Sequence, residues 1–114
     1  MHEFSLAQGL HVQLLQLAEE HGAGAISVVR VEIGSLAGIV VDSFSFGFEV
    51  LARQNKRTEN AVLEISVVDP VYRCRVCNTT FQNNLPPSTC SACGRNDLIR
   101  EGGDDLILTQ VEME

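Results

Sequence analysis

The sequence predicts an α+β fold in which a small sheet is interrupted by a cysteine-rich metal module. Apolar residues recur at helical spacing over residues 4–21, and they alternate along residues 26–33, 61–68 and 106–113. Two Cys-x-x-Cys pairs lie between the second and third alternating segments. Because a lone strand does not fold by itself, we expect the last segment to pair with the earlier ones, which makes the module an insertion.

The first helix is predicted from spacings of three and four, and Gly22 and Gly24 supply its stop signal. Its expected buried face comprises Phe4, Ala7, Leu10, Leu14, Leu17, Ala18 and His21. The strand over 26–33 then alternates between two faces. Its apolar face carries Val29, Val31 and Ile33, and its polar face carries Arg30 and Glu32.

The segment that follows the turn from Gly34 to Gly38 fits two interpretations. Alternation of Phe44, Phe46, Phe48 and Val50 suggests a strand, whereas Val41, Phe44, Phe48 and Leu51 fit one helical face. Periodicity alone leaves both open. The alternating segment 61–68 ends at Pro70. In the last segment we expect one face to carry Ile107, Thr109, Val111 and Met113.

The two cysteine pairs are the most informative feature of the chain. Each Cys-x-x-Cys places two thiolates on one tight turn, and two facing turns supply the four sulfurs of a closed tetrahedral zinc site. We therefore predict structural Zn(II) on Cys74, Cys77, Cys90 and Cys93. Three weaker alternatives are two disulfides, a redox Cys-x-x-Cys motif and an iron–sulfur centre. Little else between residues 71 and 100 would form a core, so metal is expected to stabilise this module.

Composition and charge exclude several classes of protein. The chain has 114 residues, of which 45% are hydrophobic and 20% charged, as in a globular protein. Its formal net charge of -7 argues against nucleic-acid partners and anionic membrane surfaces. No apolar run approaches the roughly 20 residues that span a bilayer. The start of the chain shows no secretory signal, so we expect a cytoplasmic protein.

The N-terminus offers a second metal chemistry. His2 follows the terminal residue directly, so the Met1 amine, the His2 amide nitrogen and the His2 imidazole can close fused chelate rings. Nitrogen donors in one plane suit nickel(II) or copper(II), and the Glu3 amide nitrogen would complete the plane. His11 and His21 are almost three turns apart on the same helix and cannot share an ion. No catalytic triad or phosphate-binding loop is present in the sequence.

The sequence resembles the HypA/HybF family of hydrogenase-maturation nickel metallochaperones along essentially its whole length. The residues that carry the resemblance are the opening Met1-His2-Glu3-Phe4-Ser5-Leu6, then residues 31–36 and 46–50, the paired cysteines, and the closing segments 103–106 and 111–114. The cysteine pairs alone are unspecific. Together with the Met-His-Glu start they are highly specific.

The resemblance implies a fold and a site. Family members have two helices on a three-stranded sheet and a zinc domain inserted before the last strand, which would make residues 41–53 a helix. The expected fold is thus a small α+β domain, residues 1–69 plus 102–114, with a four-cysteine, zinc-ribbon-like module over residues 70–101. By carry-over, His2 binds nickel with the chain end and nearby backbone nitrogens. Zinc is expected to stay all-thiolate, because no histidine flanks these cysteines.

The resemblance also implies partners. Members deliver nickel to the large subunit of nickel–iron hydrogenase and work with a maturation GTPase. We therefore expect a metallochaperone that carries Ni(II) as cargo and catalyses no reaction, as a monomer or homodimer, without nucleic acid or membrane. Two other classes remain open from the residues alone. One is a zinc-ribbon binding module, which should show a basic aromatic face. The other is a Cys-x-x-Cys redox enzyme.

Overall fold

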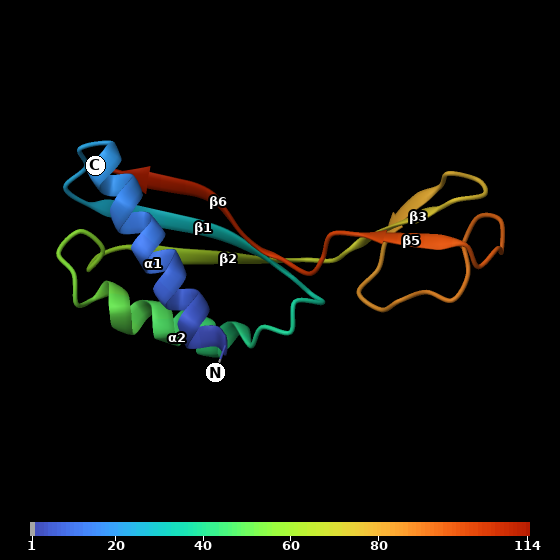
Figure 1. Cartoon of the computed structure of the whole chain (residues 1–114), viewed down its shortest axis with the longest axis horizontal. Helices are drawn as coiled ribbons and strands as arrows, with labels where there is room; N and C mark the ends of the chain where they lie inside the picture. The colour runs from blue at the N-terminus through green and yellow to red at the C-terminus, as the bar shows by residue number, and fades with distance from the viewer. Residues whose placement is uncertain (1) are drawn as a thin grey trace. The chain divides into compact units, whose positions relative to one another are not determined.

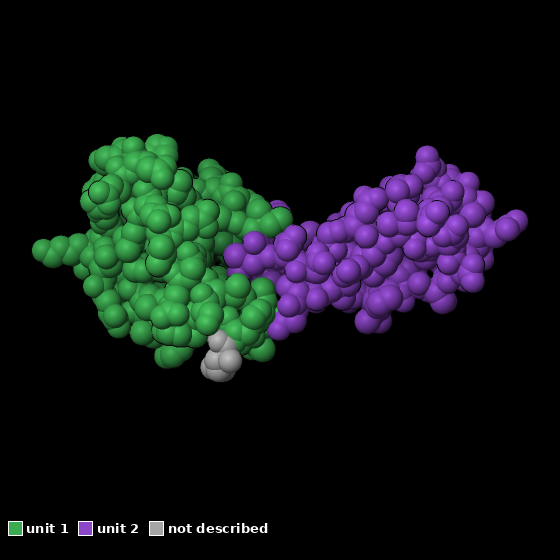
Figure 2. Space-filling view, in the orientation of Figure 1, with its two compact units in different colours: residues 1–31, 39–66, 107–114 green, residues 32–38, 67–106 purple. Residues whose placement is uncertain are grey.

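The structure, a computed structural model, describes residues 2–114 and divides into two compact units. Unit 1 comprises Met1–Val31, Ile39–Ser66 and Ile107–Glu114, and unit 2 comprises Glu32–Gly38 and Val67–Leu106 (Figure 2). Unit 2 thus holds the cysteine module together with the turn after the first strand and the flanking residues of the chain.

Unit 1 contains two helices in its described part, α1 (His2–Glu20) and α2 (Val41–Ala52). The buried positions of α1 are Ala7, Leu10, Leu14 and Ala18, four of the seven that the helical period predicts. In α2, Phe44 and Phe48 are completely buried whereas Phe46 is 69% exposed, which fits one helical face and not an alternating strand. Neither described helix is long and apolar enough to cross a membrane.

The two helices pack on each other through a small residue. A Cβ at Gly47 of α2 would lie 3.2 Å from the ring of Phe4 in the first turn of α1. Phe4 thus packs against α2 at the edge of the two helices and not in the core, and its side chain is 40% exposed. The expectation that Phe4 lies on the buried face is therefore only partly met.

A three-stranded sheet backs the helices, in the order β2-β1-β6 (Figure 1). Its strands are β1 (Ile26–Gly34), β2 (Val62–Val68) and β6 (Leu106–Met113). Strand β6 runs antiparallel to β1, because the hydrogen-bond partners run in opposite directions along the two segments. The bonded pairs are 25 with 114, 27 with 112, 30 with 109, and 34 with 105. Strand β2 runs parallel to β1, with α2 as the crossover between them. The N–H of Ile26 donates to the Arg57 carbonyl and that of Ser35 to the Val68 carbonyl, so residue numbers increase in the same direction along both segments.

The core of unit 1 lies between this sheet and the helices. Val29 and Val31 of the central strand are almost completely buried, as are Leu14, Phe44 and Phe48 of the helices. On the polar side of the sheet, Arg30 bonds Glu64 of β2 at 2.8 Å and Glu112 of β6 at 2.6 Å. One arginine thereby joins all three strands.

The predicted apolar face of β6 is wrong in its first half. Ile107 is 50% exposed, and the half-buried positions are Leu106, Leu108, Val111 and Met113. The alternation breaks because Thr109 and Gln110 are both exposed, and the Thr109 hydroxyl donates to the carbonyl of Arg30 at 3.1 Å.

Unit 2 is built on a second sheet of three short antiparallel strands, in the order β4-β3-β5. They are β3 (Val71–Cys74), β4 (Thr80–Gln82) and β5 (Leu98–Glu101). Tyr72 of β3 is buried and stacks on Phe81 with ring centroids 6.0 Å apart. The predicted α+β class is confirmed, with two helices, a three-stranded sheet and a four-cysteine module between the second and third strands of that sheet.

Candidate metal centres

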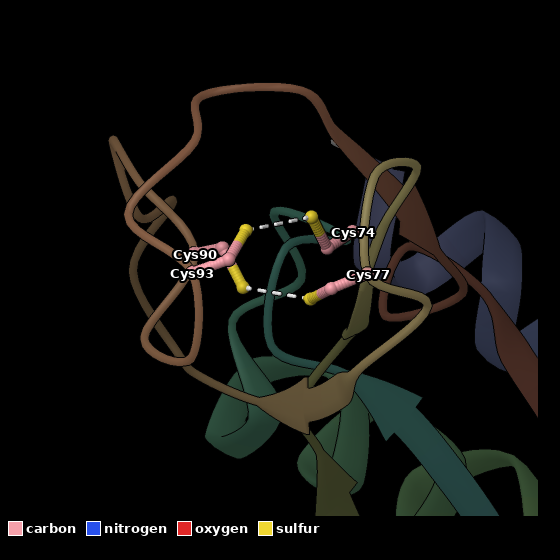
Figure 3. Close-up of side chains that lie close together, drawn as sticks. All are labelled: Cys74, Cys77, Cys90 and Cys93. Carbon is pink, nitrogen blue, oxygen red and sulfur yellow. Dashed lines mark hydrogen bonds between the residues drawn. The ribbon is translucent and has the colours of Figure 1, made fainter.

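Unit 2 gathers its four cysteines at one point. Cys74 ends β3 and Cys77 lies in the turn that follows, while Cys90 and Cys93 lie in the turn that precedes β5. The four Sγ atoms lie within 4.8 Å of one another. Figure 3 shows that the near contacts run between the two turns, Cys74 to Cys93 at 3.6 Å and Cys77 to Cys90 at 3.7 Å.

The two turns share the same backbone pattern. The N–H of Asn78 donates to the Cys74 carbonyl at 2.9 Å, and the N–H of Gly94 donates to the Cys90 carbonyl at 2.9 Å. Asn78 and Gly94 adopt left-handed φ angles of 66° and 75°, a conformation that asparagine and glycine tolerate best. The chain therefore builds two equivalent metal knuckles, each ended by a residue suited to the turn.

The spacing of the sulfurs fits a single tetrahedral ion. A Zn–S bond of about 2.3 Å places the sulfurs of a four-thiolate site about 3.8 Å apart. The 3.6 Å and 3.7 Å separations lie close to that value and far beyond a disulfide bond of about 2.05 Å. A cluster of several irons binds its cysteines to different metal atoms. The donor set and spacing thus fit a single tetrahedral ion such as zinc.

Hydrogen bonds around the sulfurs favour thiolates at the first knuckle. The Thr79 hydroxyl, 3.2 Å from Cys77 Sγ, and the Thr79 backbone N–H lower the pKa of Cys77 to about 6. The backbone N–H of Cys77 likewise lowers the pKa of Cys74. The N–H of Arg95 also favours the Cys93 thiolate, but burial and the three other sulfurs outweigh it and raise the pKa of Cys93 to about 11. A divalent cation would reverse that last effect by neutralising the shared charge.

The second predicted site lies at the start of α1. His2 is exposed in the first helical turn, and the Met1 amine, which the sequence assigns as a nickel ligand, lies outside the described residues. The Glu3 carboxylate is partly exposed to solvent but has a fixed partner, because its Oε2 accepts the backbone N–H of Val40 at 3.1 Å. This hydrogen bond, more than any other contact, lowers the pKa of Glu3.

The other two histidines have structural partners. His11 Nε2 lies 3.0 Å from the hydroxyl of Thr58, a fully buried residue in the loop after α2. His21 Nδ1 bonds the Leu17 carbonyl at 2.9 Å near the end of α1, as expected of a histidine at a helix end. Within residues 2–114, the four cysteines are the one group of three or more potential metal ligands that the fold gathers.

Sequence patterns do not predict the roles of three residues near these sites. For Thr79, the one available signal is a hydroxyl two positions after a cysteine, where it contacts the sulfur. Asn78 stands where the second knuckle has glycine, and the positive φ explains both choices. Val40 contributes only its backbone N–H, which no side-chain pattern reveals.

An apolar groove adjoins the start of α1. It has a volume of about 320 Å³ and is lined by Glu3, Phe4, Ser43, Phe46, Gly47 and Val50. Among its large apolar side chains Phe46 is the most exposed, at 69%. The groove begins at Glu3, the residue after His2, so a protein docked there would contact the residue next to His2.

Known proteins are similar to this chain along its whole length. Residues 1–113 match the family model described as "Hydrogenase/urease nickel incorporation, metallochaperone, hypA". The hydrogenase maturation factor HypA of Chlorobium phaeobacteroides is 31% identical over 114 residues, 100% of both chains. That of Caldanaerobacter subterraneus is 32% identical over 115 residues, again 100% of both chains.

A solved structure has the same fold. The solution structure of the nickel metallochaperone HypA from Helicobacter pylori superposes with a TM-score of 0.70 and 25% identity, covering 99% of this chain and 97% of that one. The chain therefore belongs to the HypA family of hydrogenase and urease nickel-incorporation proteins, which are metallochaperones and not enzymes.

Proposed function

We propose that this chain binds Ni(II) at its N-terminus and delivers it to the large subunit of nickel–iron hydrogenase. The observation that carries the proposal is the exposed His2 in the first turn of α1, in a chain that matches a nickel-incorporation family from residue 1. The ligands are the His2 imidazole, the terminal amine of Met1 and backbone nitrogens of residues 2 and 3. Four nitrogens in one plane suit nickel(II).

The helical start is compatible with such a ligand set. The first four N–H groups of a helix have no acceptor within the helix. The amide nitrogens of His2 and Glu3 can therefore release their protons to solvent and bind nickel without loss of a helical hydrogen bond. A site made of the chain end and one exposed side chain also leaves the ion open to a recipient, which suits a carrier. A buried cage would release its ion slowly.

The second metal is structural. Cys74, Cys77, Cys90 and Cys93 would hold zinc, which would fix the two knuckles to each other and stabilise the short strands of unit 2. Zinc has no redox chemistry and a closed four-thiolate site has no open position, so this centre would supply folding energy alone. A four-thiolate zinc site needs reduced cysteines, which a reducing compartment maintains, and this supports a cytoplasmic location.

The partners follow from the family. Its description names hydrogenase and urease as the enzymes into which nickel is incorporated. We assign the hydrogenase large subunit as the nickel recipient and a maturation GTPase as a second protein partner. Neither a nucleic acid nor a membrane is among the proposed partners. The carrier works as a monomer or a homodimer. The groove beside His2 supports direct docking of a protein partner next to the bound ion.

The test is a nickel titration of the zinc-loaded, untagged protein. We expect one tight nickel per chain with the absorption spectrum of a square-planar ion. Binding should be lost in His2→Ala and in a variant with one extra residue before Met1, and kept in the control His21→Ala. Unchanged binding in the first two variants would place nickel elsewhere.

Delivery needs a second assay. Nickel-loaded protein would be mixed with metal-free hydrogenase large subunit, and in parallel with metal-free urease, with and without the GTPase. Preferential transfer to the hydrogenase subunit supports the proposed recipient, whereas preferential transfer to urease would identify the other enzyme of the family description.

A further inference from the structure

One hydrogen bond joins the start of α1 to the start of α2. Glu3 Oε2 accepts the backbone N–H of Val40 at 3.1 Å, across 37 residues of sequence. Val40 is the N-cap residue of α2, with φ -79° and ψ 105°, and it has no side-chain cap of its own. Its carbonyl accepts the N–H of Phe44 and thus opens α2, while its N–H points out of the helix.

A second contact fixes the same turn of α1. A Cβ on Gly47 would lie 3.2 Å from the Phe4 ring, so a larger residue at this position would require the ring to shift by a few tenths of an ångström. The two residues that follow His2 are therefore both engaged, Glu3 on the N-cap of α2 and Phe4 on its second turn. His2 itself has no such anchor and stays exposed.

We propose that Glu3 is a positioning residue for the nickel site and not a nickel ligand through its carboxylate. The carboxylate, held by the Val40 N–H, sets the first turn of α1 so that the His2 imidazole and the backbone nitrogens of residues 2 and 3 converge on one ion. This inference rests on the proposed function. It adds the Glu3 side chain and the Val40 N–H to the residues on which nickel affinity depends.

The chain offers variants that separate positioning from ligation. Glu3→Ala removes the acceptor, and Glu3→Gln keeps an oxygen acceptor while losing the charge. Val40→Pro removes the donor, and the φ of -79° lies within the range of proline. Val40→Ala keeps the N–H and controls for the side chain. Circular dichroism and thermal unfolding of each variant report whether the fold is kept.

We expect Glu3→Ala and Val40→Pro each to weaken nickel binding roughly tenfold, the effect of losing one charge-assisted hydrogen bond. The double variant should bind no more weakly than either single variant, because both remove the same bond. Glu3→Gln should stay within a few fold of wild type, and Val40→Ala should match it. The absorption band of bound nickel should keep its wavelength in all of them, since no ligand changes.

Two results would overturn the inference while leaving the proposed function intact. The first is weakened nickel binding in both Glu3→Gln and Glu3→Ala, with a shifted absorption band for the nickel that still binds and unchanged binding in Val40→Pro. This result would make the carboxylate a ligand. The second is wild-type affinity in Glu3→Ala. If Val40→Pro fails to fold, the Glu3→Ala and Glu3→Gln pair still decides. Nickel binding that survives His2→Ala would instead overturn the proposed function.

Discussion

A Cβ added at Gly34 would lie 2.1 Å from the carbonyl carbon of Gly103, so the two glycines meet backbone to backbone. Gly103 has a φ of 78°, and a Cβ there would lie 2.5 Å from the Cβ of Pro70. The end of β1, the link from β2 to β3 and the link from β5 to β6 thus cross within unit 2 where no side chain fits. The N–H of Leu36 donates to the Gly103 carbonyl at 2.7 Å, which holds the same two segments together.

Gly34→Ala is therefore expected to destabilise the protein. The atoms that a Cβ would meet belong to the backbone and cannot rotate away, so we expect a loss of about 1–3 kcal/mol or more, as for overpacked sites. Thermal unfolding would measure it. Gly9→Ala is the matched control, because Gly9 lies inside α1 with nothing within 4 Å, and alanine there should stabilise by about 0.5–1 kcal/mol. Equal melting temperatures for the two variants would contradict the close approach.

Removal of zinc is expected to unfold unit 2 and leave unit 1 folded. The strands of unit 2 have three or four residues each, too short to persist without the metal. Cys93→Ser, or a strong chelator, should abolish protection from hydrogen exchange at residues 71–100 while the amides of α1 and α2 stay protected. Ser91→Ala in the same knuckle serves as the control. Equal loss of protection in both units would show that they unfold together.

Thr79 is expected to tune the zinc site through Cys77. Its hydroxyl lies 3.2 Å from Cys77 Sγ, and once Cys77 is a thiolate only the hydroxyl can donate in this contact. Loss of such outer partners typically weakens metal binding by roughly 10–100-fold. Thr79→Val should therefore lower zinc affinity by about tenfold or more, measured by competition with a chromogenic chelator. Thr80→Val, an exposed position of β4, should leave the affinity unchanged. A Thr79→Val protein with wild-type affinity would show that the contact is incidental.

Most elements of the fold could be predicted from local pattern, because each follows from a period that the chain itself displays. The predicted helix 4–21 is observed as His2–Glu20, and the predicted strand 26–33 as Ile26–Gly34. The segment 41–53 is ambiguous in sequence, since several apolar residues in a short run satisfy both periods. The family resemblance favours a helix, and the structure confirms it by burying Phe44 and Phe48 and exposing Phe46.

What sequence reasoning misses depends on contacts between distant segments. The Glu3 bond to Val40 involves a backbone N–H and leaves no trace in residue type. The crossing of Gly34 and Gly103 joins segments far apart in the chain, although each glycine by itself indicates a local turn. The faces of β6 cannot be assigned from alternation, because nothing near Thr109, neither glycine nor proline, marks the break. By contrast, the grouping of the four cysteines can be predicted from their spacing in the sequence alone.

His11 is expected to make the stability of the protein fall as the pH is lowered. The Thr58 hydroxyl donates its single hydrogen to the Ala52 carbonyl at 2.8 Å, so His11 Nε2 must be the donor in the 3.0 Å contact with that hydroxyl. The ring also meets Phe48 edge-on, with centroids 6.3 Å apart. Burial lowers the pKa of His11, so the folded protein keeps the ring neutral at pH values where the unfolded chain takes up a proton.

The unfolded chain therefore binds more protons between the lowered pKa of folded His11 and the ordinary value of about 6.5. The contribution of His11 to stability is complete above about pH 6.5 and is lost as the pH falls through the folded pKa. His11→Gln, whose amide N–H can still reach Thr58, should flatten the fall in melting temperature between about pH 7 and about pH 5.5. His21→Gln, at the exposed end of α1, controls for loss of a histidine elsewhere. Parallel pH profiles for His11→Gln and wild type would show that the stability lost on acidification comes from other groups.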